Sequence, residues 1–203
     1  MKKLSLLIPV YNLEDLVIKA LDSIPRRDDI EVIVRDDGST DKSLWNVLDY
    51  QETHPELPMT VCSNGVNRGV AYTKNRMLGM ANGEYIHLFD SDDYLLTQQY
   101  ETAMEHLGEA DVILFDLEVN DGSILKLTED SCGLYCAQIA RFIRRDFVEG
   151  IEFPEHIRAA DDWYYANDIM ARNPKQLFTG IVAYHYNWPR EGSLSDLKIK
   201  GLI

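Results

Sequence analysis

The 203-residue chain is poor in cysteine, in positive charge and in long hydrophobic runs, and each shortage excludes a class of protein. Its three cysteines, Cys62, Cys132 and Cys136, are odd in number and scattered, which argues against a disulfide scaffold and favours a reducing, cytoplasmic setting. No apolar run approaches the roughly 18–20 residues of a membrane-spanning helix. The apolar stretch at residues 4–10 is short and lacks a cleavage site, which argues against a secretory signal.

Positive charge is scarce, because 20 Lys and Arg residues stand against 34 Asp and Glu residues and the formal net charge is −14. A chain this acidic repels the phosphates of nucleic acids and of anionic membranes, so nucleic acid is excluded as a partner. A bound divalent cation would relieve that repulsion locally. The length and composition are those of one globular domain with a sizeable core.

Strand-like and helix-like segments alternate along the first part of the chain. Short apolar runs predict strands at residues 4–10, 31–35, 58–63 and 85–89. Apolar residues at helical spacing predict helices at residues 13–24 and 70–81, with another that follows the turn at residues 36–41 and ends near residue 50. This alternation predicts an α/β fold with a Rossmann-like, mainly parallel sheet flanked by helices.

The second part of the chain is less regular. Helices are expected at residues 98–107, 135–147 and 161–171, strands at 111–119 and 181–188, and a hairpin return at 122–127. No linker or internal repeat separates the two parts, so we expect a single domain.

Polar clusters follow the predicted strands at the point where each strand ends. They are Pro9 to Asn12, Asp36 with Asp37, the segment around Asn67 and Arg68, and Asp90 to Asp93. Because ligands of parallel sheets bind beyond the carboxyl ends of the strands, we expect these clusters to form one site.

The run Asp90-Ser91-Asp92-Asp93 places three carboxylates within four residues. Such groups repel one another unless a hard cation lies among their oxygens. Asp90 and Asp92 are therefore candidate ligands of Mn²⁺ or Mg²⁺, which would bridge to a diphosphate. A solvated acidic turn that caps the next helix is the alternative.

The other strand ends offer groups suited to a nucleotide. Asp36 or Asp37 can accept hydrogen bonds from a base or a ribose, and the ring of Tyr11 can stack on a base. Asn67, Arg68, Asn75 and Arg76 are candidates for contacts to phosphate. The alternatives are a helix cap for the two aspartates, a packed ring for Tyr11 and surface ion pairs for the arginines.

Three further features lie late in the chain. Asp161 and Asp162 open a predicted helix, where one carboxylate can deprotonate a hydroxyl or simply favour the helix dipole. His185 is a possible metal ligand or a packed strand residue. Arg190 can clamp a phosphate from a loop.

Taken together, these segments resemble the family 2 glycosyltransferases, which have the GT-A fold. The resemblance covers about the first 95 residues in order and spacing. It rests on Leu7 to Asn12, Val32 to Asp41, Asn67 to Arg76 and Ala81 to Asp93. Later in the chain, Asp161-Asp162 resembles the family's E-D pair, and Tyr186 to Ser195 resembles its closing motif.

The resemblance implies an inverting enzyme that takes a sugar from a nucleotide diphosphate, commonly uridine diphosphate. It implies that Tyr11 stacks on the base and that Asp37 reads the base edge with Asp36 nearby. It also implies that Asp92 holds the metal and that Asp162 is the general base. The remaining donor-side candidates are Pro9, Asn12, Asp90, which would approach the ribose or the metal, and Ser91.

Residues 1–95 would then form a nucleotide-sugar-binding half, and residues 96–203 an acceptor-binding half of the same domain. The acceptor would be a saccharide or a lipid-linked oligosaccharide, as in cell-surface polysaccharide synthesis. A cytoplasmic protein is expected, with attachment to the inner membrane face as a further option.

The chain departs from the family pattern at several places. Asp161 replaces the usual Glu, Lys74 stands where the family tends to have Arg, and Asn187 stands where Arg is frequent. The chain also stops soon after the closing motif, so either the acceptor site is minimal, or a partner subunit or a missing segment completes it.

Two other classes of protein stay open. A nucleotidyltransferase would more readily carry a Gly-rich, basic loop after the first strand, whereas Tyr11 to Asp15 lacks glycine and is acidic. A catalytically inactive, nucleotide-binding relative would not need the carboxylates at positions 90, 92 and 162.

Overall fold

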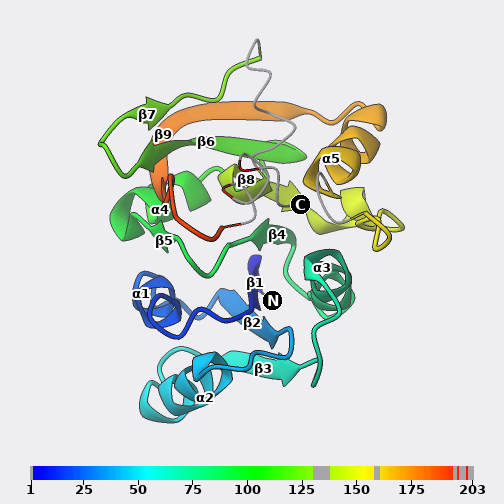
Figure 1. Ribbon diagram of the computed structural model, residues 1–203. Coiled ribbons are helices and arrows are strands. Elements are labelled where there is room, and N and C mark those ends of the chain that lie inside the picture. Colours follow the sequence, from blue (N-terminus) through cyan, green and yellow to red (C-terminus); the bar gives the residue numbers. More distant parts are fainter. Residues whose placement is uncertain (1, 130–137, 158–160, 194–195, 197–199, 201–203) are drawn as a thin grey trace.

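The computed structural model describes residues 2–129, 138–157, 161–193, 196 and 200 (Figure 1). The first half contains β1 (Leu4–Val10), α1 (Val17–Asp22), β2 (Ile30–Asp36), α2 (Ser43–Thr53), β3 (Met59–Ser63), α3 (Val70–Leu78) and β4 (Tyr85–Leu88). The second half contains β5 (Tyr94–Leu95), α4 (Thr97–Met104), β6 (Val112–Val119), β7 (Ile124–Leu125), the 3₁₀ helix η2 (Gln138–Ala140), β8 (Arg141–Arg144), the 3₁₀ helix η3 (Arg145–Val148), α5 (Asp161–Ala171) and β9 (Gln176–Tyr186).

One sheet runs through both halves in the order β3-β2-β1-β4-β8-β6-β9-β5, with β7 paired to β6. The strands β3, β2, β1 and β4 are parallel, and so are β6 and β9. β8 runs antiparallel to both β4 and β6 and joins the two parallel groups. The helices α1, α2 and α4 lie on one side of the sheet, and α3 and α5 lie on the other (Figure 1). The predicted α/β fold with a mainly parallel sheet is confirmed.

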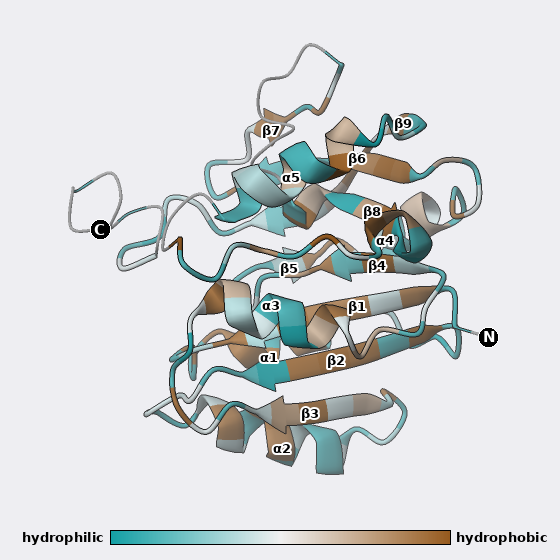
Figure 2. Ribbon diagram, turned by 90° about the vertical axis from the view of Figure 1, so that its right-hand side faces the viewer, coloured by the Kyte–Doolittle hydropathy of each residue, from teal (hydrophilic) through white to brown (hydrophobic). Residues whose placement is uncertain are grey.

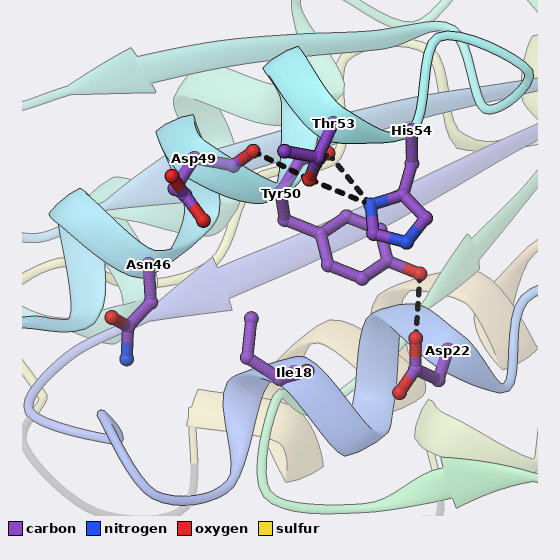
Figure 3. Close-up of a pocket in the computed structure, with 7 residues that line it drawn as sticks. All are labelled: Ile18, Asp22, Asn46, Asp49, Tyr50, Thr53 and His54. Carbon is purple, nitrogen blue, oxygen red and sulfur yellow. Dashed lines mark hydrogen bonds between the residues drawn. The ribbon is translucent and has the colours of Figure 1, made fainter.

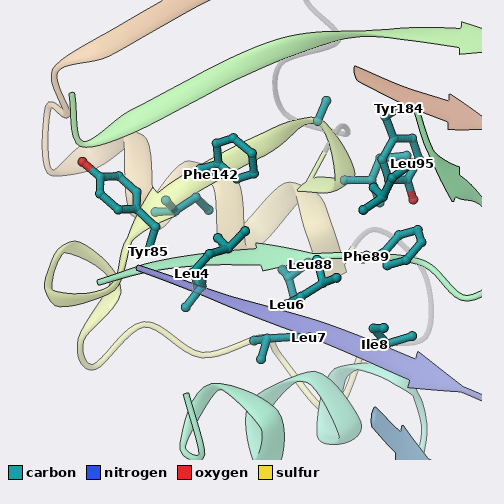
Figure 4. Packing of buried hydrophobic residues seen from close by; sticks show 14 of the residues in the cluster. Leu4, Leu6, Leu7, Ile8, Tyr85, Leu88, Phe89, Leu95, Phe142 and Tyr184 are labelled. Atoms are coloured by element: carbon teal, nitrogen blue, oxygen red, sulfur yellow. The ribbon is translucent and has the colours of Figure 1, made fainter. Parts of the chain in front are cut away.

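The central strand β1 shows why the sheet is covered on both faces. Leu4, Leu6, Leu7 and Ile8 are buried completely although alternate residues point to opposite faces. Figure 4 shows these side chains packed with Leu88 and Phe89 from the end of β4. In Figure 2, which is coloured by hydropathy, β2 and β6 are largely brown, whereas the helices α2 and α3 mix brown and teal.

The predicted helix at residues 135–147 is wrong over its described part, residues 138–147. That part is a short 3₁₀ turn followed by β8, which pairs with β4 and β6 in the middle of the sheet. Arg141, Phe142 and Ile143 are consecutive on the strand and all buried, so β8 is covered on both faces. A segment of four residues that is buried on both faces has no periodicity that separates helix from strand. Residues 135–137 lie outside the described part.

The other boundaries differ by a few residues. α1 begins at Val17 rather than residue 13, and the turn before it is closed by the N–H groups of Leu16 and Val17, which both donate to the Leu13 carbonyl at 3.0 Å. The N–H of Leu13 donates to the Ser43 hydroxyl at 2.7 Å, and that of Glu14 donates to the Asp41 carboxylate at 3.1 Å. Within the described residues, no helix has the length and apolar character to cross a bilayer.

Candidate active site

The loop between β4 and β5 carries Asp90, Ser91, Asp92 and Asp93, and it is fixed from two sides. On the β1 side, the Ser91 hydroxyl donates to the Pro9 carbonyl at 2.6 Å. On the β9 side, the buried Asp93 carboxylate accepts from the Tyr184 hydroxyl at 2.6 Å and from the Asn187 N–H at 2.8 Å. Asp93 thus binds the end of β9 to this loop.

The carboxylates of Asp90, Asp92 and Asp93 form one group, in which one oxygen of each lies within 4.8 Å of the others. Burial, together with the charge of Asp92, raises the pKa of Asp90 to about 7, although Lys74 opposes the rise. Burial and the charge of Asp90 raise the pKa of Asp93 to about 8. A divalent cation would offset this crowding, and carboxylate oxygens are the donors that Mg²⁺ and Mn²⁺ prefer. The donor set therefore fits the predicted metal.

Arg190 contacts the same group. Its Nε donates to Asp92 Oδ2 at 2.8 Å, and the two side chains are 25% and 19% exposed. The residue predicted to clamp a phosphate thus lies directly beside a predicted metal ligand.

The second pair of carboxylates lies in the first turn of α5. Asp161 is buried, whereas the Asp162 side chain is 35% exposed. Nζ of Lys74, on α3, lies 2.7 Å from Asp162 Oδ1 and 3.5 Å from Asp161 Oδ2. Burial raises the pKa of Asp161, and the charge of Lys74 opposes that rise.

A relay of contacts holds α5 against α3. The Asn75 amide donates to the Phe153 carbonyl at 2.9 Å and accepts from the Phe153 N–H at 2.8 Å. The Phe153 ring stacks on Tyr165 of α5 with centroids 3.9 Å apart. The side-chain amide of Asn75, which was predicted to contact the donor, therefore binds the segment around Phe153 that packs against α5.

The two aspartates after β2 hold backbone groups. Asp36 accepts from the N–H groups of Gly38 and Ser39 at 3.0 and 3.2 Å. Asp37 accepts from the N–H groups of Arg68 and Gly69 at 2.8 and 2.9 Å. Both carboxylates are buried and thus shape the turn and the loop that leads into α3.

Gly38, in that turn, is required by geometry. Its φ is +73°, and a Cβ at this position would lie 2.4 Å from the backbone carbonyl carbon of Val66. The turn after β2 and the loop before α3 therefore touch, which brings Asp37 and Arg68 to one place.

Tyr11 and Asn12 follow β1 at the same edge. The Tyr11 ring is 44% exposed, so it is open to a stacking partner. Asn12 has a φ of +51° and accepts from the Thr40 N–H at 2.8 Å, so it fixes the neighbouring turn.

Two of the predicted phosphate contacts, Arg68 before α3 and Arg76 in its last turn, are exposed. The guanidinium groups of Arg68 and Arg76 lie 4.7 and 4.9 Å from the centroid of the Tyr72 ring. Asn67 is exposed beside them. The Tyr72 ring holds both arginine side chains, and among the described residues their guanidinium N–H groups have no hydrogen-bond partner.

His185 lies apart from the three grouped carboxylates. Its Nε2 is 3.0 Å from Asn120 Oδ1, its Nδ1 is 3.4 Å from Glu118, and its ring stacks on Tyr94 with centroids 4.2 Å apart. A metal role for His185 stays a prediction.

A pocket of about 400 Å³ lies elsewhere, between α1 and α2 (Figure 3). Its side chains bond to one another, since the Tyr50 hydroxyl donates to Asp22 at 2.8 Å and the His54 ring stacks on Tyr50. None of the predicted site residues lines it.

Tyr184 was not among the predicted site residues, and Lys74 was noted only as a cation that stands where the family tends to have Arg. A signal for Lys74 was present, because it shares a helix face with the buried Ala71 and Met77 at a spacing of three residues. Tyr184 gave no signal, because an aromatic residue on a strand is ordinary core.

The comparisons with known proteins agree with this geometry. The sequence profile of Glycosyl transferase family 2 matches residues 5–159. A poly(ribitol-phosphate) beta-glucosyltransferase of Bacillus spizizenii is 30% identical over 212 residues, which cover 94% of this chain and 33% of that protein. The chain thus spans about a third of that relative's length. The UDP-Glc:alpha-D-GlcNAc-diphosphoundecaprenol beta-1,3-glucosyltransferase WfaP of Escherichia coli is 27% identical, with 100% of this chain and 84% of that protein covered.

A solved structure shows the same fold. S. aureus TarS 1-349 in complex with UDP-GlcNAc superposes with a TM-score of 0.79 at 26% identity, covering 94% of this chain and 60% of that one. The profile match spans well over half of the 203 residues, from β1 through the carboxylate loop and beyond β8. The chain therefore belongs to glycosyl transferase family 2.

Proposed function

We propose that the chain is a metal-dependent, inverting glycosyltransferase that moves a sugar from a nucleotide diphosphate, UDP being expected, to a hydroxyl acceptor. The observation that carries the proposal is the meeting of two carboxylate groups at one sheet edge. The charges of Lys74, Asp161 and Asp162 from the helices all act on Asp90 of the β4–β5 loop. The candidate metal ligands and the candidate base are thus within electrostatic reach of each other.

The donor would lie along the edge formed by residues 1–95. Asp90 and Asp92 would hold Mn²⁺ or Mg²⁺, and that ion would neutralise charge on the departing diphosphate. Tyr11, with its exposed ring, would stack on the base. Asp37 would present the loop at residues 64–69 to the base, with Asp36 fixing the turn below it.

The phosphates would be bound by cations that already border the site. Arg68 and Arg76 have exposed guanidinium groups, and Arg190 would move from Asp92 to a phosphate oxygen. Pro9, Asn12, Ser91, Asn67 and Asn75 would shape the donor site through the turns that they fix.

Asp162 would act as the general base. Its Oδ1 is bonded to Lys74, and within the described residues Oδ2 has no hydrogen-bond partner. Oδ2 would take the proton of the acceptor hydroxyl while the acceptor oxygen attacks the anomeric carbon. The bond to the diphosphate oxygen breaks on the opposite face, its electron pair leaves with the diphosphate, and the configuration inverts.

Residues 96–203 would provide the acceptor side. The rings of Trp163 and Tyr164 follow Asp162 directly, are 46% and 45% exposed, and suit a saccharide face. The relatives support a cell-surface saccharide or lipid-linked acceptor, because WfaP is named for a diphosphoundecaprenol-linked substrate. Such an acceptor favours a cytoplasmic protein that works at the inner membrane face, with a further segment or partner completing the site.

The test compares the wild type with Asp92→Ala and Asp162→Ala. Titrating UDP with and without Mn²⁺ should show metal-dependent binding that Asp92→Ala loses and Asp162→Ala keeps. Transfer from a UDP-sugar to an acceptor saccharide should fall by at least about 100-fold in both variants. Asp168→Ala is the matched control, because Asp168 is an exposed residue of the same helix α5.

Other outcomes would contradict the proposal. UDP binding without turnover of any nucleotide sugar would support an inactive relative. Release of inorganic pyrophosphate in place of UDP would support a nucleotidyltransferase. Near-normal transfer by Asp162→Ala would remove Asp162 as the base.

A further inference from the structure

Lys74 is a buried cation in the middle of α3, where its helix faces the core. The side chain of Lys74 is 6% exposed, and its Nζ lies 4.8 Å from the centroid of the Phe153 ring. A buried ammonium is tolerated only where partners replace its water. Asp162 at 2.7 Å and Asp161 at 3.5 Å are those partners.

The contact with Lys74 gives the two carboxylate oxygens of Asp162 different environments. Oδ1 is bonded to Lys74, while Oδ2 belongs to a side chain that is 35% exposed. A bond to Oδ1 restricts the rotation of the carboxylate and so limits the directions in which Oδ2 can point. The direction of Oδ2 is thus set by a residue on a different helix.

The same ammonium balances the charges around it. Although burial disfavours it, the charges of Asp162 and Asp161 raise the pKa of Lys74 above its usual value, so the ammonium stays charged at neutral pH. Without it, the buried carboxylate of Asp161 would lose the charge that opposes the rise of its pKa, and Asp161 and Asp162 would repel each other.

We propose that Lys74 is the positioning residue for the candidate base, holding Asp162 through Oδ1 so that Oδ2 faces the acceptor hydroxyl. The inference rests on the proposed glycosyl transfer. It gives α3, which begins at the donor edge, a direct connection to the acceptor-side helix α5. Lys74 acts through Asp162 and touches neither substrate.

The test uses Lys74→Met, which keeps much of the side-chain volume and removes the charge, and Lys74→Arg, which restores a cation. In Lys74→Met, kcat for transfer should fall about 100-fold. The affinity for UDP with Mn²⁺, measured by calorimetry, should change far less than kcat, because Lys74 bonds to Asp162 directly and acts on Asp90 through its charge alone. The acid limb of the pH–rate profile should move to higher pH, and Lys74→Arg should recover most of the loss.

Lys3→Met is the matched control, because Lys3 is an exposed lysine before β1 at the opposite sheet edge. It should leave kcat, UDP affinity and the pH–rate profile unchanged. If Lys74→Met does not fold, Lys74→Gln, which keeps a hydrogen-bond donor without the charge, takes its place.

Two results would overturn the inference. One is a kcat within threefold of the wild type. The other is an equal loss of kcat and UDP affinity with an unmoved acid limb, which would make Lys74 a merely structural residue. Both are distinct from failure of the proposed function, in which the wild type itself would show no metal-dependent transfer.

Discussion

Two side-chain cations neutralise acid groups that the proposed reaction uses. Arg190 pairs with Asp92 at 2.8 Å, and Lys74 pairs with Asp162 at 2.7 Å. The two contacts differ in consequence. Lys74 leaves one oxygen of Asp162 available for its proposed task, whereas Arg190 stands beside a carboxylate that a metal must also reach. Metal binding and the Arg190 contact should therefore compete.

Arg190→Gln should bind Mn²⁺ several-fold more tightly than the wild type when no nucleotide is present. The substitution removes a positive charge beside Asp92, which a cation would otherwise have to displace or tolerate. The same variant should bind UDP with Mn²⁺ about tenfold more weakly, because a phosphate contact is lost. Electron paramagnetic resonance titration of free Mn²⁺ measures the first effect and calorimetry the second.

Arg27→Gln is the control for that experiment, because Arg27 pairs with Asp29 and Glu101 away from the carboxylate loop. It should change neither affinity. A Mn²⁺ affinity that is unchanged or weaker in Arg190→Gln would contradict the competition between the arginine and the metal.

The chemical type of a site residue was easier to predict than its partner. Asp37 was expected to read a base, yet its carboxylate holds N–H groups of Arg68 and Gly69, over 30 residues further along the chain. Asn75 was expected near the donor, yet its amide binds the backbone of Phe153. Carboxylate and amide side chains can hydrogen-bond to the backbone of a loop as well as to a ligand. Only the tertiary contacts show which of the two a given side chain binds.

Among the elements, α3 and β8 show what periodicity can and cannot predict. α3 has one buried face, so its helical spacing was readable and its position next to the strand-end clusters followed from the βα alternation. β8 is buried on both faces, and its pairing with β4 and β6 depends on segments more than 20 residues away in the sequence. Its strand character comes from those neighbours and not from its own pattern.

His87, on β4, links three elements and should make stability depend on pH. Its Nδ1 lies 2.7 Å from the Tyr100 hydroxyl of α4, and its Nε2 lies 2.7 Å from the Ile139 carbonyl of η2. A neutral ring satisfies both, with Nε2 donating and Nδ1 accepting. Burial lowers the pKa of His87 to about 4, below the value near 6.5 expected in the unfolded chain.

The unfolded state therefore binds more protons in this range, and the contribution of His87 is complete above pH 6.5 and lost as the pH falls toward 4. Between pH 7.5 and 5 the wild type should lose about 2 kcal/mol that His87→Gln does not lose, because glutamine does not titrate. Urea unfolding of both proteins at both pH values measures the difference. The raised pKa values of Asp90 and Asp93 make stability rise as the pH falls, but this effect is the same in both proteins and cancels in the comparison. A stability gap between the two proteins that does not narrow at pH 5 would show that His87 is not held neutral.

At the scale of the whole molecule, the fold determines where the excess of acid groups is concentrated. The net charge is −14, and part of the excess is concentrated at the carboxyl edge of the sheet in two carboxylate groups. The fold of the first half was predictable because each strand is followed by a polar cluster in a regular order. The second half was less predictable because its strands are mixed in direction and its contacts are long in sequence.

Because the proposed metal site brings together carboxylates that repel one another, supplying a divalent cation with UDP should stabilise the fold. UDP with Mn²⁺, each at about 100 times its dissociation constant, should add about 3 kcal/mol by mass action and raise Tm by roughly 5–10 °C. Either ligand alone should give a smaller shift, and a chelator should reverse the joint effect. Asp92→Asn should abolish the increment, whereas Asp168→Asn on the exposed side of α5 should keep it. Thermal unfolding in the four mixtures measures this, and a full shift with UDP alone would mean that the nucleotide is bound without the carboxylate loop.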